Sequence, residues 1–534
     1  MTKTDKGTEA EEAYLDDIVA ILLDGKLRSK EDLHKVKLRL ARKYHSKDLP
    51  SDATILERIP EEAVPLLLPL LRTKAVRSVS GVAVVAAMTS PAKCPHGKCL
   101  YCPGGVENGT AQSYTGKEPA ALRATMNDFD AFREVSARLV QLKAIGHPTD
   151  KIDLIIMGGT FTARELSYQE DFVKGCFDAM NGKKAPDLPT AITWNETAPS
   201  RCIGLTIETR PDCFGHDIIA RTMDMGMTRV ELGVQTLYDD VLKTMQRGHP
   251  VAAAVQANKD ARNGGLKVCF HMMPGMPGVD ETMELKAWDQ LFSDPKFRPD
   301  MLKIYPCLVI KGTGIYDLWK KGDFTPMTTE QAVDILAKVK AKLPKWVRIQ
   351  RIQRDIPVQL IDAGIKKSNL RQLVQDRMEE LGTKCRCIRC REVGHRALRG
   401  DKVDGKSIEL LEETYEACNG TEVFLSVEDT SQDILISYLR LRFPGNWWRP
   451  ETQGCAFLRE MKVLGEVVPI GKHDETAWQH AGRGQELLAR AEAKALELGA
   501  DRILVTSGVG AREYYRKNGY ERTGPYMGKS LRTK

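Results

Sequence analysis

Seven short apolar runs between residues 80 and 350 constrain the fold of this chain more than any other feature. They are Val82–Met88, Leu154–Met157, Ile203–Ile207, Val230–Val234, Val268–Met272, Leu302–Tyr305 and Val347–Ile352. The runs are almost continuously apolar, as strands buried on both faces of a parallel sheet are, and helical stretches separate them. This alternation predicts repeated βα units with right-handed crossovers. We therefore expect an open or partial α/β barrel over residues 81–350, with its site at the carboxyl ends of the strands.

Two other regions flank the predicted barrel. Residues 1–80 are expected to be helical, and residues 351–415 form a basic linker. Residues 416–534 return to an α/β pattern, with a strong helix at 485–498 that is rich in Ala, Leu and Glu. The strands expected in this last region are Phe424–Val427, Ile434–Phe443, Cys455–Val463 and Ile503–Thr506.

A tight group of cysteines follows the first predicted strand. Cys94, Cys99 and Cys102 have the spacing C-x4-C-x2-C. Three thiolates on one loop can hold three irons of a 4Fe–4S cluster and leave the fourth iron open to a substrate. That arrangement suits the delivery of one electron to S-adenosylmethionine (SAM), although the first gap is one residue longer than radical-SAM enzymes usually have. The alternative is zinc, for which His96 offers a fourth ligand.

Glycines and polar residues stand where three of the other strands are predicted to end. Gly158, Gly159 and Thr160 follow the second strand, and two glycines there let the backbone approach a ligand closely. The other such residues are Glu208 and Arg210 after the third strand and Gln235 after the fourth. A simple turn and a structural salt bridge are the alternatives, but their place at strand ends favours ligand binding.

A phosphate-binding pattern precedes the helix at 485–498. Gln479–Gly484 fits [QR]-x-x-G-x-[GA], and unshielded N–H groups at a helix N-terminus bind pyrophosphate. A strand before it and the segment Tyr514–Tyr520 after it occur in the order typical of GNAT acetyltransferases. The expected coenzyme A contacts are therefore Gln479, Gly482, Arg483, Gly484 and Tyr514. Tyr515 stands where a proton donor to the coenzyme A thiolate would stand.

A second cysteine group lies in the basic linker. Cys385, Cys387 and Cys390 have the spacing C-x-C-x2-C, which suits a structural zinc ion. His395 is the fourth ligand expected from the local sequence, and Cys418 and Cys455 are more distant options. The 13 cysteines are odd in number and partly clustered, which argues against a secreted disulfide framework.

The net charge is modest, because 79 Lys and Arg are balanced by 72 Asp and Glu. The basic residues are nevertheless concentrated locally. The basic residues of interest are Lys26, Arg28, Lys35, Lys37, Arg39, Arg42 and Lys43, with Arg386 and Arg389 beside the second cysteine group. They form either a solvated face or a phosphate-contacting surface. The longest apolar stretch, Ala63–Leu71, is far shorter than the roughly 18 residues of a membrane span. With a polar, acidic N-terminus, this predicts a cytoplasmic protein without membrane association.

Taken together, these patterns resemble one family, the catalytic subunit of the Elongator complex with its archaeal and bacterial stand-alone relatives. The resemblance extends from about residue 75 to 530. Its phrases include CPHGKCLYCPGG (94–105), SYTGKEPAALRA (113–124), IMGGTF (156–161), IETRPD (207–212), RGHP (247–250), HMMPG (271–275), QRDIP (353–357), REVG (391–394), SGVGAREYYRKNGY (507–520) and GPYM (524–527). It implies a radical-SAM barrel fused to a GNAT domain.

The resemblance also implies an activity. The substrate would be tRNA with uridine at the wobble position, and the product 5-carboxymethyluridine. Acetyl-CoA would supply two carbons. A 5′-deoxyadenosyl radical would take a hydrogen atom from the acetyl methyl group, the carbon radical would add to carbon 5 of the uracil, and water would then hydrolyse the thioester. The partners implied are the anticodon stem-loop, an electron donor and either further copies of the chain or Elongator-like subunits.

Residue roles follow from the same resemblance. Cys94, Cys99 and Cys102 would bind the 4Fe–4S cluster, and Gly158, Gly159 and Glu208 would bind SAM. The acetyl-CoA contacts would be Lys151, Glu460, Met461, Lys462, Val463, Gly482, Arg483, Gly484 and Tyr515. Among these, Lys151, Glu460 and Tyr515 are the candidate catalytic residues. The basic N-terminal run and the surface around Arg386 and Arg389 would contact tRNA phosphates.

Two other functions remain open from the sequence. One is a protein lysine acetyltransferase in which the iron–sulfur domain is structural and Glu460 is the general base. The other is a tRNA-binding scaffold with decayed active sites. The complete cysteine triplet and the intact Gln479–Gly484 loop argue against the scaffold, because a decayed site has no reason to keep either.

Overall fold

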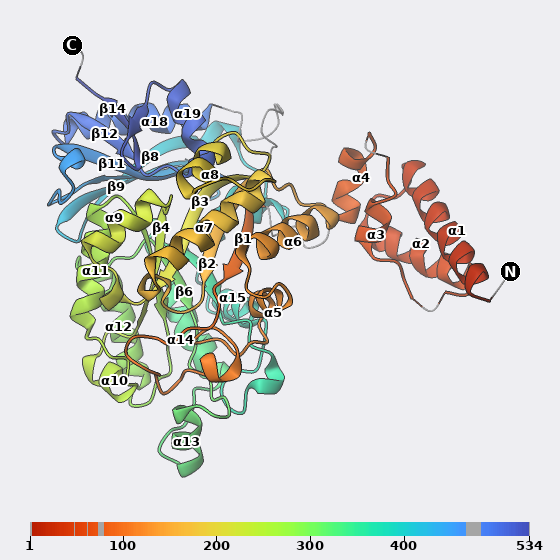
Figure 1. Ribbon diagram of the computed structural model, residues 1–534, viewed down its shortest axis with the longest axis horizontal. Helices are drawn as coiled ribbons and strands as arrows, with labels where there is room; N and C mark the ends of the chain where they lie inside the picture. The colour runs from red at the N-terminus through yellow and green to blue at the C-terminus, as the bar shows by residue number, and fades with distance from the viewer. Residues whose placement is uncertain (1–2, 47, 61, 73–78, 466–481, 533–534) are drawn as a thin grey trace.

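The chain folds into an N-terminal group of helices and two seven-stranded sheets that pack against each other (Figure 1). The computed structural model describes residues 3–46, 48–60, 62–72, 79–465 and 482–532. No helix within these ranges combines the length and apolar character that crossing a bilayer requires. Both sheets carry α/β architecture, as the sequence predicts.

The first sheet is the predicted partial barrel, and all seven of its expected strands are confirmed. The strands are parallel and follow chain order: β1 (Ala83–Met88), β2 (Lys151–Met157), β3 (Arg201–Thr209), β4 (Arg229–Gln235), β5 (Lys267–Met272), β6 (Met301–Ile304) and β7 (Arg348–Ile352). The helices between them are α5 (Pro119–Met126), α6 (Ala131–Ala144), α7 (Leu166–Asn181), α8 (Leu188–Asn195), α9 (His216–Asp224), α10 (Asp239–Thr244), α11 (Val251–Asn263), α12 (Glu281–Ser293), α13 (Gly314–Lys321) and α14 (Thr329–Ala341). Because every strand runs the same way, their carboxyl ends meet at one rim.

The second sheet has the mixed strand directions of a GNAT-type acetyltransferase. Its order is β13 (Glu521–Thr523), β14 (Tyr526–Ser530), β12 (Arg502–Val505), β11 (Cys455–Val463), β10 (Ile434–Phe443), β9 (Gly420–Asp429) and β8 (Ile408–Ala417). Only β11 and β12 pair in parallel. The helix α18 (Arg483–Glu497) packs on β10 and β11, and α19 (Arg512–Lys517) follows β12.

The second sheet starts earlier than the sequence pattern suggests. Its edge strand β8 has the sequence IELLEETYEA, of which only Ala417 is buried. Because its acidic residues resemble those of a loop, the sequence pattern assigns it to the linker. The remainder of that linker holds α15 (Leu370–Glu380), α16 (Ile388–Arg391) and α17 (Val393–Ala397). The bridge Glu392–Leu435 joins this segment to β10.

A buried ionic network joins the barrel to the second sheet. Arg459 of β11 donates from Nη1 and Nη2 to the two carboxylate oxygens of Asp300, at 2.7 and 2.8 Å. Glu422 of β9 accepts from Arg459 Nη2 at 2.6 Å and from Arg262 Nη1 of α11 at 2.9 Å. Burial alone would raise the pKa of Asp300, but the guanidinium groups of Arg262 and Arg459 hold it far below its usual range. The two sheets are therefore tied together by charge pairs that water does not reach.

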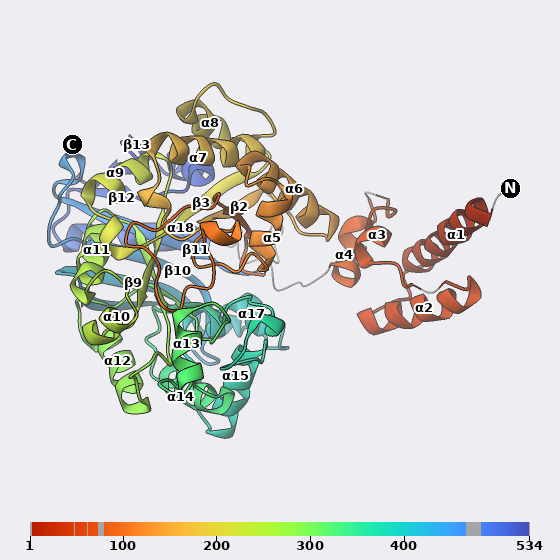
Figure 2. The ribbon, with the colours of Figure 1, turned by 60° about the horizontal axis from the view of Figure 1, so that its bottom comes forward.

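Four helices form a separate N-terminal group to one side of the molecule (Figures 1 and 2). They are α1 (Lys3–Leu23), α2 (Lys30–Lys43), α3 (Asp52–Leu56) and α4 (Val64–Leu71), which confirms the helical prediction for this region. They have their own apolar core, which includes Ile18 and Leu33. The group reaches the barrel at the end of α6, where Arg72 Nε donates to Gly146 O at 3.2 Å.

Candidate functional site

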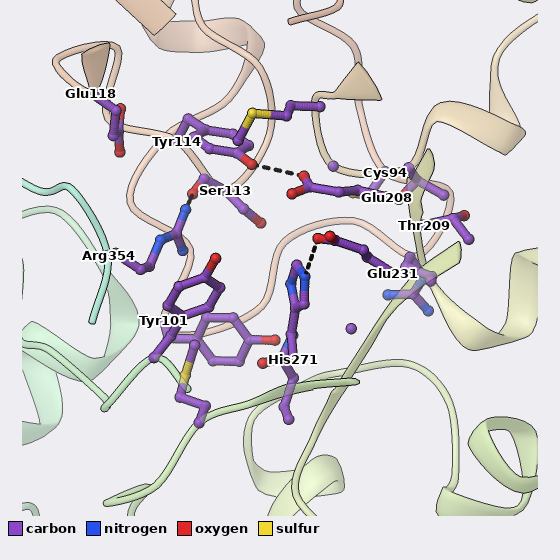
Figure 3. Close-up of a pocket in the computed structure, with 18 of the residues that line it drawn as sticks. Cys94, Tyr101, Ser113, Tyr114, Glu118, Glu208, Thr209, Glu231, His271 and Arg354 are labelled. Carbon is purple, nitrogen blue, oxygen red and sulfur yellow. Dashed lines mark hydrogen bonds and ion pairs between the residues drawn. The ribbon is translucent and has the colours of Figure 1, made fainter. Parts of the chain in front are cut away.

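The carboxyl ends of the barrel strands surround a cavity of about 110 Å³ (Figure 3). Residues predicted to bind the iron–sulfur cluster or SAM line it together, namely Cys94, Gly159, Thr160, Glu208, Arg210 and Gln235. They come from the ends of four strands that lie far apart in the sequence. The structure thus brings these predicted residues to one place.

The three cysteines after β1 lie in an environment suited to thiolates. Cys94, Cys99 and Cys102 are all buried. Gln112 Nε2 lies 2.8 Å from Cys102 Sγ, and Arg247 Nη1 lies 3.7 Å from Cys99 Sγ. Donors of this kind offset the negative charge that a thiolate-bound iron–sulfur cluster carries. The residues present therefore fit a 4Fe–4S cluster.

The glycine turn after β2 needs glycine at both positions. Gly158 has φ +134°, and a Cβ there would lie 2.0 Å from Thr89 Oγ1. Gly159 has φ +88°, and its Cβ would lie 3.1 Å from the carbonyl oxygen of Gln112. An L side chain is strained at such φ values and has no room here. Glycine therefore lets this turn pack closely against Thr89 and Gln112, with Gly159 in the cavity lining.

We expect Gly158→Ala to weaken SAM binding at least about tenfold, because strain of about 1–3 kcal/mol must be relieved by moving the turn. Isothermal titration of the cluster-loaded protein measures this. The matched control is Gly182→Ala at the end of α7, where φ is +71° but no atom lies within 4 Å of the added Cβ. Equal SAM affinity in Gly158→Ala and the natural protein would contradict the role of this turn.

Charged and polar side chains of the barrel interior line this cavity. Tyr114 OH donates to Glu208 Oε2 at 2.8 Å, and His271 Nε2 lies 2.8 Å from Glu231 Oε2 (Figure 3). Lys303 lies between the carboxylates, 3.5 Å from Glu208 Oε1 and in contact with Glu231. Burial alone would raise the pKa of Glu231, but Lys303 first and His271 next lower it well below its usual range. The barrel interior is thus a paired polar network.

The sequence interpretation missed most of this network, although a signal was present. On β4 the inward residues are Arg229, Glu231, Gly233 and Gln235, and on β5 they are Lys267, Cys269 and His271. Polar residues thus recur at every second position, which is the period of one strand face. Neighbouring strands with polar residues in the same phase indicate a polar interior rather than an apolar one.

A second cavity of about 460 Å³ lies between the amino ends of the barrel strands and the second sheet. Lys151, at the start of β2, lines it from the barrel. Strand β11 contributes Glu460, Met461, Lys462 and Val463, and α19 contributes Tyr514 and Tyr515, so seven residues predicted to contact acetyl-CoA meet here. Arg229 and Lys267 also line this cavity and were not predicted.

The described end of the predicted phosphate-binding loop, Gly482–Gly484, lies next to this cavity. Gly482 has φ +72° and forms the N-cap of α18, and no side chain of the described residues caps the helix there. A Cβ on Gly484 would lie 2.8 Å from Tyr514 OH, so this turn packs against the cavity lining. Arg483 Nη1 pairs with Glu486 Oε2 at 2.8 Å. Gln479 lies outside the described residues.

In the second cavity, the surroundings shift the pKa values of two candidate catalytic residues in opposite directions. Burial alone would raise the pKa of Glu460, but the guanidinium of Arg440, 2.9 Å away, and the ammonium groups of Lys462 and Lys267 lower it to about 2. Glu460 is therefore a weak proton acceptor. Burial raises the pKa of Tyr515, so its phenol stays protonated and is a weaker acid than an exposed tyrosine.

The two cavities are separated by one layer of side chains. Arg229 lines the second cavity and Glu231 the first, and they stand two residues apart on β4, or about 7 Å between Cα atoms. Arg229 Nε is 3.9 Å from Glu231 Oε1, and its Nη1 and Nη2 each lie 3.3 Å from an oxygen of Asp153. The cavities therefore share a wall through the barrel interior.

The second cysteine group also forms a compact set. The sulfurs of Cys385, Cys387 and Cys390 lie within 4.8 Å of one another, as ligands of a single ion do. His395 does not join them, because its Nε2 lies 2.9 Å from Glu392 Oε1. Cys418 accepts from Asn258 Nδ2 at 3.1 Å in the domain interface.

The predicted tRNA-contacting residues are mostly exposed, with one correction. Lys37 is 7% exposed, and its ammonium donates to Pro50 O at 2.9 Å and to Asp52 Oδ1 at 2.5 Å. Its role is therefore to hold α2 against α3, not to contact phosphate. Those that remain exposed are Lys26, Arg28, Lys35, Arg39, Arg42, Lys43 and Arg386, whereas Arg389 is half-buried.

Three protein-family models match the chain. They are the Radical SAM superfamily over residues 88–286, the Radical_SAM C-terminal domain over 299–380 and the ELP3 N-terminal domain over 12–79. The chain is 52% identical to the tRNA uridine(34) acetyltransferase of Methanocaldococcus jannaschii, with 90% of each chain covered. It is 41% identical to human Elongator complex protein 3, over 97% of this chain and 96% of the human one.

A solved structure agrees with these relationships. An N-terminally truncated archaeal Elp3 from Methanocaldococcus infernus matches with a TM-score of 0.76 and 47% identity. The match covers 85% of this chain and all of the solved one. The fold described above is thus shared with that structure over the barrel and the second sheet.

Proposed function

Because the chain belongs to the family of Elongator complex protein 3 and the archaeal tRNA uridine(34) acetyltransferases, we propose that it forms 5-carboxymethyluridine at the wobble position of tRNA. Acetyl-CoA would supply the two carbons and SAM the radical. The observation that carries this proposal is the wall shared by the two cavities at Arg229 and Glu231. A barrel that binds SAM at one end and an acyl donor at the other would allow the two to react within one chain.

The first cavity holds the residues for the radical chemistry. Cys94, Cys99 and Cys102 would hold the 4Fe–4S cluster that membership of the Radical SAM superfamily implies. When bound, the cluster supplies one electron that splits SAM into methionine and a 5′-deoxyadenosyl radical, which takes a hydrogen atom from the acetyl methyl group. The Gly158–Gly159 turn, with Gly159 in the cavity lining, would lie against SAM.

The second cavity holds the residues for the acyl donor. The N–H groups at the start of α18 would receive the pyrophosphate, and Glu460–Val463 would lie along the rest of coenzyme A. Lys267 and Arg229 make the inner end cationic, which suits the carbonyl oxygen of a thioester. When water hydrolyses the thioester, Tyr515 would donate a proton to the departing thiolate.

The remaining predicted sites fit the same function. Exposed basic residues on the N-terminal helices, together with Arg386, would contact phosphates of the anticodon stem-loop. The Cys385–Cys390 group would hold a structural zinc ion beside this surface. An electron donor is also required, since each cleavage of SAM consumes one electron.

We expect Cys387→Ser to remove the zinc and destabilise the linker, because structural zinc contributes directly to folding free energy. Metal analysis by mass spectrometry measures the zinc, and limited proteolysis reports the linker. Cys176→Ser, at a buried cysteine that is not a candidate ligand, is the matched control and should keep the ion. A natural protein without zinc, or a Cys387→Ser variant that retains it, would contradict the assignment.

A protein lysine acetyltransferase is the alternative that uses the same acetyl-CoA cavity. It needs a general base near the acetyl group. The low pKa of Glu460 makes this residue unsuited to that task at neutral pH. This observation favours the tRNA-modifying function.

The proposal is tested by nucleoside mass spectrometry on unmodified tRNA. The protein is reconstituted anaerobically with iron, sulfide and a reductant, and then receives SAM, acetyl-CoA and tRNA. We expect 5-carboxymethyluridine, and we expect it to disappear when any one component is omitted. Acetylated lysine in a peptide substrate with no modified uridine would instead support the acetyltransferase.

A further inference from the structure

The lengthened first gap of the cysteine motif places one histidine beside the cluster site. His96 is the second of the four residues between Cys94 and Cys99. Its Nε2 lies 3.1 Å from Cys99 Sγ, and its Nδ1 lies 2.6 Å from Nη1 of Arg210. Each ring nitrogen thus has one close partner.

The partner on Nδ1 determines where the ring proton is. A guanidinium has only N–H donors, so Nδ1 must accept the hydrogen bond from Arg210. A doubly protonated ring would point an N–H at an N–H across 2.6 Å, which is repulsive. In the neutral ring with Nδ1 as acceptor, the proton is on Nε2. His96 therefore donates from Nε2 to the sulfur of Cys99.

Arg210 is itself held so that it fixes this arrangement. Its Nε and Nη2 donate to the two oxygens of Asp212, at 3.0 and 2.8 Å, and its Nη1 also donates to the carbonyl oxygen of Arg247 at 2.8 Å. Arg210 is only 2% exposed. A side chain with this many buried partners has one orientation, so the His96 tautomer is set before the cluster binds.

The segment after α10 packs onto the other side of the imidazole. Gly248 has φ +78°, and a Cβ there would lie 2.7 Å from His96 Cβ. Glycine thus lets the backbone approach the histidine, and the preceding Arg247 places Nη1 3.7 Å from Cys99 Sγ. Cys99 consequently has two donors from two different loops.

We propose that His96 is a positioning residue that donates its Nε2 hydrogen to the Cys99 thiolate and raises the reduction potential of the bound cluster. Hydrogen bonds to the sulfurs of an iron–sulfur cluster stabilise its reduced, more negative state. His96 then serves the cluster through Cys99 and is not itself a metal ligand. This inference rests on the cluster of the proposed function.

Two variants and a matched control test the inference in the full reconstituted chain. His96→Leu removes the donor, whereas His96→Gln keeps an N–H at a similar distance from the backbone. Lys98→Met changes the same loop at an exposed residue that reaches only Glu107, 3.7 Å away. The midpoint potential is measured by reductive titration, and exchangeable protons near the cluster are detected by pulsed electron–nuclear double resonance after transfer to D₂O.

We expect His96→Leu to shift the midpoint potential to a more negative value and to lose one exchangeable-proton coupling. His96→Gln and Lys98→Met should match the natural protein in both. An unchanged potential in His96→Leu would overturn the inference.

A measurement on the natural protein keeps the test valid if a variant does not fold. With ¹⁵N-labelled histidine, a hydrogen-bonded ring gives a weak nitrogen coupling to the reduced cluster, and this is the expected result. A strong coupling would show direct coordination, and no coupling would show that the ring is not bonded to the site; either result overturns the inference. Failure of the proposed function is distinguished by a separate measurement, because the spectrum of the reduced cluster would then not change on addition of SAM.

Discussion

Replacement of Cys99 by alanine is expected to abolish both 5′-deoxyadenosine formation and tRNA modification, a loss of more than about 1,000-fold. Cys99 is buried and is one of three thiolates available to the cluster after β1. Two ligands cannot hold a cluster with one open iron in this loop, so no electron reaches SAM. Chromatography of 5′-deoxyadenosine and nucleoside mass spectrometry measure the two products from one reaction.

The same variant should keep the acetyl-CoA site, because that cavity lies at the other end of the barrel strands. Unchanged acetyl-CoA affinity would therefore show that the protein is folded. Cys213→Ala is the matched control, since this half-buried cysteine lies outside the triplet. Substantial tRNA modification by Cys99→Ala would contradict the radical mechanism and point to the acetyltransferase function.

Replacement of Asp300 by asparagine is expected to cost about 3–5 kcal/mol of stability, the usual cost of breaking a buried ion pair. Asp300 lies completely buried between Arg262, Arg440 and Arg459. Its loss leaves these guanidinium groups with too few carboxylates inside the domain interface. For folded units of this size the unfolding midpoint should fall by roughly 10 °C, as measured by differential scanning calorimetry.

Lys338→Met is the control for this comparison. Lys338 and Glu281 are an exposed pair, with side chains 48% and 53% accessible, and such pairs contribute about 0–1 kcal/mol. Equal midpoints for Asp300→Asn and Lys338→Met would show that the buried network does not hold the two sheets together. Because a chain of this size does not unfold in one step, midpoints are compared rather than free energies.

The barrel could be predicted from the sequence because its strands are buried on both faces. A continuous apolar run such as Leu154–Met157 has few other places in a soluble fold. The polar interior was not predicted for the same reason, since Glu208 was assessed only as a strand end. The edge strand β8 was missed for the opposite reason, because its exposed acidic residues resemble a loop.

Parts of the candidate site could be predicted where the functional residues are close together in the sequence. The Cys94–Cys102 loop, the Gly158–Gly159 turn and the start of α18 are such cases. Contacts between distant segments were not predictable from residue patterns alone. Lys37 belongs to a basic run, but only the fold shows that Asp52 neutralises it. Likewise, Arg229 and Lys267 meet the second sheet only because the two sheets pack together.

The most direct test of the central claim follows the acetyl group with isotopes. The reaction is run with acetyl-CoA that carries ¹³C at both acetyl carbons and deuterium in its methyl group. We predict that both ¹³C atoms enter 5-carboxymethyluridine and that 5′-deoxyadenosine gains one deuterium. 5′-Deoxyadenosine without deuterium, or uridine that carries an intact deuterated acetyl group, would contradict the account.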